Sequence, residues 1–241
     1  DLKKDYDAVL IAGGASVSRD INLPGRDIQG IHFAMDFLSQ QNRICEGDGV
    51  TDSHITAKGK NVVIIGGGDT GADCLGTSHR QGAKSVVSLE IMPKPPSTRR
   101  SKNPWPEWPR VYRVASAHEE GGERKYAIST TKFIGDDNHQ LRAIEVVTVD
   151  QIERANGSSE FIEIEGTKRE IPCELVLLAM GFTGPYLWDN IEESGIKFDN
   201  RQNIQVNSKW MTSLEGVFAA GDAKRGQSLI VWAIAEGRSA A

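Results

Sequence analysis

The feature that most constrains the fold is a strand that runs directly into a glycine-rich turn and a helix. Asn61–Ile65 (NVVII) is apolar after its first residue, as strands buried on both faces of a parallel sheet are. The turn Gly66–Gly71 (GGGDTG) follows, then a helical segment to about Gln81 and a second strand at Ser85–Glu90. This order predicts a β-α-β unit, because a parallel partner strand needs a helical crossover.

The turn also has the spacing G-x-G-x-x-G, which presents backbone N–H groups and a helix N-terminus to a pyrophosphate. We therefore expect a nicotinamide dinucleotide there, with Glu90 accepting hydrogen bonds from the adenosine ribose. Glu90 would repel a 2'-phosphate and favours NADH, whereas Arg99 in the following loop could hold that phosphate, so the predicted cofactor is NAD(P)H. The residues expected around the pyrophosphate are Gly66, Gly67, Gly68, Asp69, Thr70 and Gly71.

Composition excludes several other classes. A net charge of -5 gives no electrostatic reason to bind nucleic acid, and the longest apolar runs are far shorter than the ~20 residues of a membrane helix. Three widely spaced cysteines and five unpaired histidines fit neither a disulfide framework nor a metal site, so no metal is assigned. We expect a cytoplasmic protein with no nucleic-acid or membrane partner.

The segments around the β-α-β unit predict how the chain is divided. Tyr6–Ala12 reads as a strand and Ile31–Leu38 as a helix, and the polar stretch after them places a domain boundary near residue 57. Beyond the unit, several β-type runs indicate an antiparallel meander that returns to a buried strand at Glu174–Met180. These runs are Lys125–Ile134, Leu141–Ile152 and Phe161–Glu165.

A proline-rich segment separates the β-α-β unit from the meander. Six of the nine prolines fall between Pro93 and Pro109, together with Trp105 and Trp108, which rules out a helix or a central strand. We expect an ordered surface element over Pro93–Arg110 that buries one of the two indoles against the nucleotide domain or a partner.

The segment Thr212–Asp222 ends an apolar strand in Gly-Asp at the head of a helix, and here the chain resembles the pyridine nucleotide-disulfide oxidoreductase superfamily. The resemblance implies that the Asp contacts the ribityl and phosphate region of FAD. The runs Leu10–Gly14 and Leu178–Phe182 resemble the two crossovers by which that superfamily leaves and re-enters its FAD domain. The implied FAD-binding residues are Gly181, Gly221, Asp222 and Leu229.

Further motifs, above all Asn103–Arg110 (NPWPEWPR), resemble the small (beta) subunit of glutamate synthase over nearly all 241 residues. That resemblance implies hydride transfer from NAD(P)H to FAD, and then electron transfer through iron-sulfur clusters to an FMN in the large (alpha) subunit. Glutamate is made there from 2-oxoglutarate and glutamine. The family's cysteine-rich region and first FAD glycine motif are absent from these residues, so the FAD site is expected to be incomplete and the isolated fragment inactive.

The expected fold is therefore α/β: a Rossmann-like NAD(P)-binding domain (residues 57–184) inserted into a partial FAD-binding domain (residues 1–56 and 185–241), in a two-dinucleotide-binding layout with an antiparallel meander. No side chain is assigned as a catalytic acid, base or nucleophile, because the cofactors carry hydride-transfer chemistry. Two alternatives stay open. One is a related NAD(P)H:FAD electron-input module that serves another electron acceptor, of the pyrimidine reductase or transhydrogenase type. The other is a non-catalytic nucleotide-binding docking module.

Overall fold

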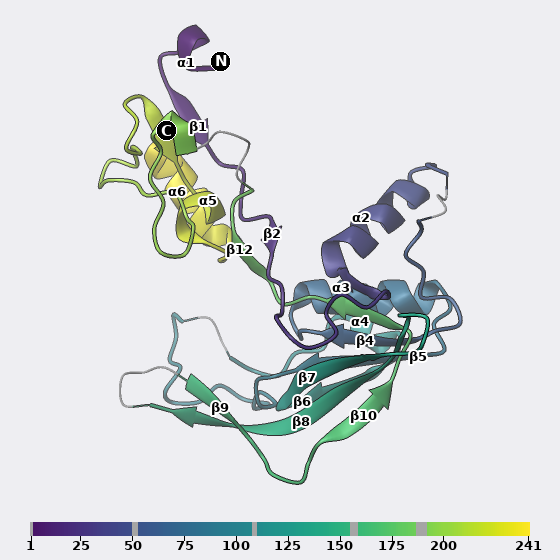
Figure 1. Cartoon of the computed structure of the whole chain (residues 1–241). Coiled ribbons are helices and arrows are strands. Elements are labelled where there is room, and N and C mark those ends of the chain that lie inside the picture. The colour runs from purple at the N-terminus through teal and green to yellow at the C-terminus, as the bar shows by residue number, and fades with distance from the viewer. Residues whose placement is uncertain (1, 50–52, 108–109, 155–158, 187–191) are drawn as a thin grey trace. The chain divides into compact units, whose positions relative to one another are not determined.

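The computed structural model describes residues 2–49, 53–107, 110–154, 159–186 and 192–241 (Figure 1). The chain separates into two compact units. The larger unit comprises residues 20–180, and the smaller unit combines residues 1–19 with residues 181–241. These divisions differ from the predicted boundaries after residues 56 and 184.

The larger unit is built on a five-stranded parallel sheet in the order β3-β11-β4-β5-β6. The two strands of the predicted β-α-β unit, β4 and β5, are neighbours in it. Parallel pairing of this kind requires the crossover helix that the sequence predicted. The strands are β3 (Ile31–Phe33), β11 (Leu175–Leu178), β4 (Asn61–Ile65), β5 (Ser85–Glu90) and β6 (Glu123–Tyr126).

The predicted helix over Ile31–Leu38 is wrong at its start. Residues 31–33 form β3, which pairs with β11 in the register Val176↔Ile31, and helix α2 begins only at Ala34. Pairing with β11 satisfies the backbone groups of this buried segment, an outcome that helical spacing alone does not reveal. The same pairing explains why the larger unit begins at Asp20 rather than at residue 57.

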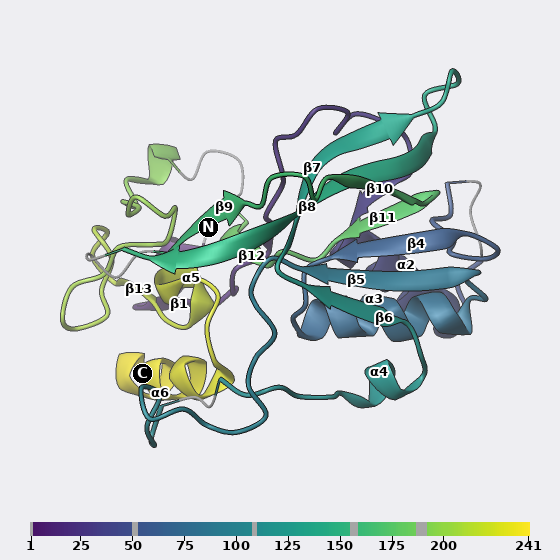
Figure 2. The ribbon, with the colours of Figure 1, turned by 90° about the horizontal axis from the view of Figure 1, so that it is seen from below.

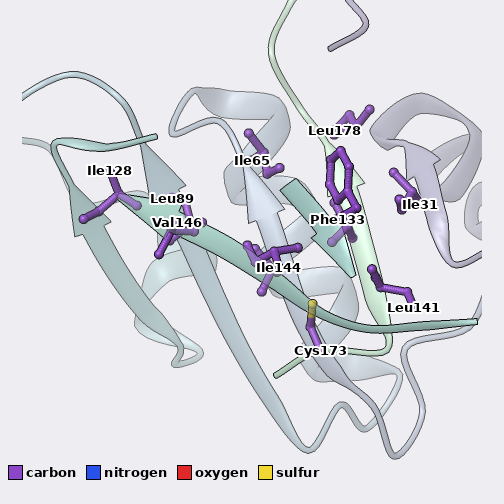
Figure 3. Close-up of a cluster of buried hydrophobic side chains, with 12 residues drawn as sticks. Ile31, Ile65, Leu89, Ile128, Phe133, Leu141, Ile144, Val146, Cys173 and Leu178 are labelled. Carbon is purple, nitrogen blue, oxygen red and sulfur yellow. The ribbon is translucent and has the colours of Figure 1, made fainter. Parts of the chain in front are cut away.

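Two layers cover the parallel sheet. Helices α2 (Ala34–Cys45) and α3 (Asp69–Arg80) lie on one face and the antiparallel strands on the other (Figure 2). Side chains of a strand alternate between faces, so Val62 and Ile64 of β4 pack under the helices while Val63 and Ile65 face the antiparallel sheet. The sheet therefore has a hydrophobic core on each face, and Figure 3 shows the one under the antiparallel strands.

The antiparallel layer confirms the expected meander in outline, with strand order β10-β8-β7 and β9 paired to β8. The run predicted over Lys125–Ile134 is divided in two at Ala127, which adopts a positive φ of 56°. Its first part becomes β6 of the parallel sheet. The antiparallel strands are β7 (Ile128–Gly135), β8 (Leu141–Glu153), β9 (Ser159–Glu163) and β10 (Arg169–Pro172), and the short helix α4 (Ser116–Glu119) precedes β6.

The smaller unit has two short strand pairs, β1 with β13 (parallel) and β2 with β12 (antiparallel). Its core is small, formed by Ile196, Ile204 and three residues of the β13–α5 region. Its elements are α1 (Leu2–Asp5), β1 (Val9–Ile11), β2 (Val17–Ser18), β12 (Phe182–Gly184), η1 (Glu192–Ser194), β13 (Val217–Ala219), α5 (Asp222–Arg225) and α6 (Ile230–Ala240). Across the described ranges of both units, no helix has the length and apolar character needed to cross a bilayer.

Candidate functional site

The glycine turn lies where β4 ends and α3 begins, and two of its glycines are required by close packing. Gly66 has a φ of 123°, and a Cβ there would overlap the carbonyl oxygen of Ala179. A Cβ on Gly71 would overlap the carbonyl oxygen of Gly66, so only glycine lets α3 approach the strand so closely. These two positions would be glycine in any chain with this turn, whether or not it binds a ligand.

Gly68 differs from the other two motif glycines. It is the N-cap of α3 with an ordinary φ of -80°, and a Cβ added there would meet no atom within 4 Å. Neither packing nor backbone conformation therefore requires glycine at this position. The open space lies before the first turn of α3, whose N–H groups at Asp69, Thr70 and Gly71 have no acceptor within the helix. This is the arrangement that accepts a phosphate group.

Glu90 reaches this turn from the end of β5, as the spacing predicted. Its Oε2 accepts a hydrogen bond from the Gly67 N–H at 2.9 Å, and its Oε1 accepts one from the Met92 N–H at 3.0 Å. A Cβ on Gly67 would lie 2.6 Å from Oε2, so the contact also depends on a glycine. The carboxylate is thus fixed at the carboxyl edge of the sheet, beside the helix N-terminus, where each oxygen keeps a further lone pair for a ligand hydroxyl.

The Arg99 side chain forms hydrogen bonds within its own loop. Its Nη1 donates to the carbonyl oxygens of Asn103 (3.2 Å) and Glu107 (3.0 Å). The buried Asn103 side chain in turn donates to the Glu107 carboxylate (2.9 Å) and accepts the Arg110 N–H (2.8 Å). Arg99 therefore holds the proline-rich loop together.

Within this loop, Trp105 is 83% exposed, so its indole is not buried against the larger unit. Trp108 lies outside the described residues. Burial of either indole against a partner stays a prediction.

The second predicted site lies in the smaller unit, at the turn between β13 and α5. Gly221 has a φ of 67°, and Oδ1 of Asp222 accepts a hydrogen bond from the Ser228 hydroxyl at 2.9 Å. Leu229, 38% exposed, is the N-cap of α6. Gly181 has a φ of 82° and lies against the Gln227 side chain, which accepts the Phe182 N–H at 3.0 Å. Gly221 and Asp222 thus lie at one turn and Leu229 begins α6, while Gly181 is linked to the segment before Leu229 through the Gln227 side chain.

Sequence reasoning missed Glu236, which organises this turn. Its carboxylate is only 2% exposed and accepts the Gly221 N–H at 3.0 Å. It also accepts hydrogen bonds from Arg225 Nε at 2.7 Å and Lys224 Nζ at 3.4 Å. The available signal was a single acid within the otherwise apolar helix Ile230–Glu236. Among the residues that the structure describes, no cluster of His, Cys, Asp and Glu could hold a metal ion.

Comparisons with known proteins agree with this geometry. Residues 1–108 and 119–237 match the family described as pyridine nucleotide-disulphide oxidoreductase. The fold resembles Mycobacterium tuberculosis FprA in complex with NADPH, with a TM-score of 0.71 at 17% sequence identity, over 99% of this chain and 63% of that one. The chain belongs to the pyridine nucleotide-disulphide oxidoreductase family.

Within this family, the chain is homologous to glutamate synthases. It is 52% identical over 246 residues to the NADPH glutamate synthase small chain of Mycobacterium tuberculosis, covering 100% of this chain and 49% of that protein. It is 44% identical over 251 residues to the NADH glutamate synthase of Schizosaccharomyces pombe, covering 100% of this chain and 12% of that protein. The chain thus spans about half the length of the bacterial small chain.

Proposed function

We propose that this chain is the NAD(P)H-oxidising, electron-input part of a glutamate synthase small chain. The larger unit binds NAD(P)H, and the smaller unit supplies one part of an FAD site. The observation that carries the proposal is the combination of Gly68 and Glu90. Gly68 leaves open space at the N-terminus of α3, although packing does not require a glycine there. Glu90 holds a carboxylate beside that space.

The residues of the larger unit suit the adenosine half of a nicotinamide dinucleotide. The N–H groups of Asp69 and Thr70 would hold the pyrophosphate at Gly67–Gly68, and the dipole of the 12-residue helix α3 would stabilise its charge. The lone pairs of Glu90 not used by Gly67 and Met92 would accept a hydroxyl of the adenosine ribose.

The smaller unit suits only one end of FAD. The Asp222 carboxylate, held by Ser228 through one oxygen, meets the ribityl chain, while Gly181 and Leu229 line the approach to the flavin. The parallel pair β1–β13 has no glycine turn of the Gly66–Gly71 kind, so the adenine end of FAD needs further chain. A bound flavin would supply the hydride acceptor, and the residues here would bind and orient it and exclude water.

The remaining assignments rest on the resemblance to the glutamate synthase small subunit. The partner is a glutamate synthase large subunit, which receives electrons through iron-sulfur clusters and an FMN held outside this chain. The compartment is the cytoplasm, supported by the three free cysteines Cys45, Cys74 and Cys173. Identity of 52% over the whole of this chain and 49% of an NADPH glutamate synthase small chain favours this acceptor over those of pyrimidine reductases or transhydrogenases.

Gly68→Ala tests the nucleotide site. The backbone at this position accepts alanine, and the new methyl group has room in the free chain, so stability should not fall. The methyl group would occupy the space of the pyrophosphate, and we expect the Kd for NADPH and NADH to rise about tenfold or more in a titration of nicotinamide fluorescence.

The matched control is Gly237→Ala, the same change at another open position, on α6 in the smaller unit. It should leave both dissociation constants unchanged. Unaltered nucleotide binding by Gly68→Ala would mean that the turn serves helix packing only, and the proposed function would then be wrong.

A further inference from the structure

Next to Glu90 lies a stack of two cations and two aromatic rings that the assignments above do not use. We call it the Tyr112 stack: Lys94, Tyr112, Arg124 and Tyr126. The Lys94 Nζ lies 4.7 Å from the Tyr112 ring centroid, and the Arg124 guanidinium carbon lies 4.8 Å from the same centroid. Arg124 also lies 5.6 Å from the Tyr126 ring, which meets Tyr112 edge-on at 6.3 Å. Tyr112 is thus the centre of a compact cationic cluster.

The fold places this stack at the same sheet edge as the glycine turn. Strands β5 and β6 are parallel neighbours, in a register that pairs Glu90 with Tyr126. Lys94 follows β5 by four residues, and the Tyr112 N–H donates to the Pro96 carbonyl oxygen at 2.8 Å, which ties Tyr112 to the chain just after Lys94. The carboxyl ends of adjacent parallel strands are where this fold class binds its nucleotide.

Electrostatics links the stack to Glu90 directly. Burial raises the pKa of Tyr126, the positive charge of Arg124 lowers it, and Tyr112 and Glu90 raise it further. Glu90 is therefore within electrostatic reach of the Tyr126 hydroxyl. Among the described residues, that buried hydroxyl has no hydrogen-bond partner.

The two cations of the stack are available to an anion. No salt bridge between described residues involves Lys94 or Arg124. Nη1 of Arg124 donates to the Tyr112 hydroxyl (3.3 Å) and to the Arg113 carbonyl oxygen (3.0 Å), which orients the guanidinium and leaves its other N–H groups. The Glu90 carboxylate instead accepts hydrogen bonds from the Gly67 and Met92 N–H groups, so it neutralises neither cation through a salt bridge.

We propose that the Tyr112 stack binds the 2'-phosphate of NADPH, and that Arg124 and Lys94 make the chain prefer NADPH to NADH. This inference rests on the proposed function of the glycine turn. A guanidinium and an ammonium held against the same ring can each offer a phosphate a charge-assisted hydrogen bond. Arg99 is the weaker candidate, because its Nη1 is bonded to two carbonyl oxygens of its own loop.

The test is a titration of the chain with four probes: NADPH, NADH, adenosine 2',5'-bisphosphate and 5'-AMP. The two adenosine probes differ by the 2'-phosphate alone and need no nicotinamide site. We expect the wild type to bind each 2'-phosphorylated probe about tenfold or more tightly than its counterpart. Arg124→Ala should abolish this ratio, and Lys94→Ala should reduce it, while the Kd for NADH stays within about twofold.

Lys125→Ala is the matched control. Lys125 is on the same strand, projects to the opposite face from Arg124 and pairs with Glu123 at 3.2 Å. Lys125→Ala should leave unchanged the ratio of Kd values between the probes with and without the 2'-phosphate. Arg124→Lys keeps the charge without the planar guanidinium and should give an intermediate ratio. Unchanged NADH binding in each variant shows that the nucleotide domain is folded.

Two results would overturn the inference and leave the proposed function standing. The first is equal binding of NADPH and NADH by the wild type. The second is a ratio that survives Arg124→Ala and Lys94→Ala, including the case in which Arg99→Ala removes it. Absence of binding for all four probes would instead contradict the proposed function itself.

Discussion

The two units differ in how fully each buries its own apolar surface. The larger unit encloses its parallel sheet between two hydrophobic cores, with Ile64, Leu175 and Leu177 fully buried. The smaller unit has one core of five buried residues, and its helix α6 exposes a run of large apolar side chains. These are Ile230 (75%), Val231 (60%), Ile234 (56%) and Trp232 (49%).

This difference separates a unit with an extensive core on each face of its sheet from a unit with a small core and an exposed apolar helix. Burial of apolar area is the main source of stability, so the larger unit should unfold later than the smaller one when the chain is denatured. The buried network of Glu236 compensates in part, since it ties α6 to the Gly221 turn through charged hydrogen bonds. The following predictions test this contrast by changing one unit and measuring both.

The largest effect is expected from Ile64→Ala in the larger unit. Ile64 is completely buried among α2, α3 and β11, and removing its side chain should lower the free energy of unfolding of this unit by about 2–5 kcal/mol. Ile230→Ala makes the same change at a site that is 75% exposed, and should alter stability by less than about 0.5 kcal/mol.

The change in the free energy of unfolding of the larger unit would be measured by thiol labelling during urea unfolding. Burial raises the pKa of Cys74 and of Cys173 to about 12, so these two thiols, which both belong to the larger unit, are protected in the folded chain. Exposed Cys45 reacts at once and provides the baseline. Equal shifts for Ile64→Ala and Ile230→Ala would contradict the contrast between the units.

Glu236→Gln should have a smaller effect, confined to the smaller unit. The amide oxygen can still accept the Gly221 N–H, but the charge that pairs with Arg225 and Lys224 is lost. We expect the smaller unit to lose about 1–3 kcal/mol, the usual scale for a buried hydrogen bond to a charged group. Tryptophan fluorescence from Trp210 and Trp232, which contact Lys224 and Arg225, should report it. Earlier labelling of Cys74 would show that the effect is not local.

Local patterns sufficed for the parts of the molecule that depend on neighbours in sequence. The strand–turn–helix at Asn61–Arg80 and the placement of Glu90 beside Gly67 follow from spacing within a single β-α-β unit. The antiparallel meander was likewise visible from alternating runs.

Long-range pairing accounts for what the sequence could not predict. Residues 31–33 have helical spacing but become a strand because β11, far away in sequence, lies beside them. Glu236 was hidden because its partners at Gly221 and Arg225 lie on another element. The Tyr112 stack joins loop residues to strand β6 in the same way, whereas Arg99, chosen by its nearness to Glu90 in sequence, bonds to its own loop.

The smallest effect concerns how the stability of the larger unit depends on pH. His32 on β3 has its pKa lowered by burial first, and further by the charges of Lys60 and Arg26, against an opposing contribution from Asp36. The folded chain therefore binds its proton more weakly than the unfolded chain, whose histidine titrates near 6.5. As pH falls below that value, the unfolded state takes up a proton that the folded state resists, and stability is lost.

His32→Gln removes this coupling between histidine protonation and stability. The stability of the variant, followed by Cys74 labelling from pH 8 to pH 5, should fall less steeply than that of the wild type below pH 6.5. The two curves should run parallel above pH 7, where His32 is neutral in both states, and that region is the internal control. Curves that stay parallel down to pH 5 would show that His32 keeps its ordinary affinity for protons in the folded chain. The smaller unit should show no such difference, because His32 belongs to the larger one.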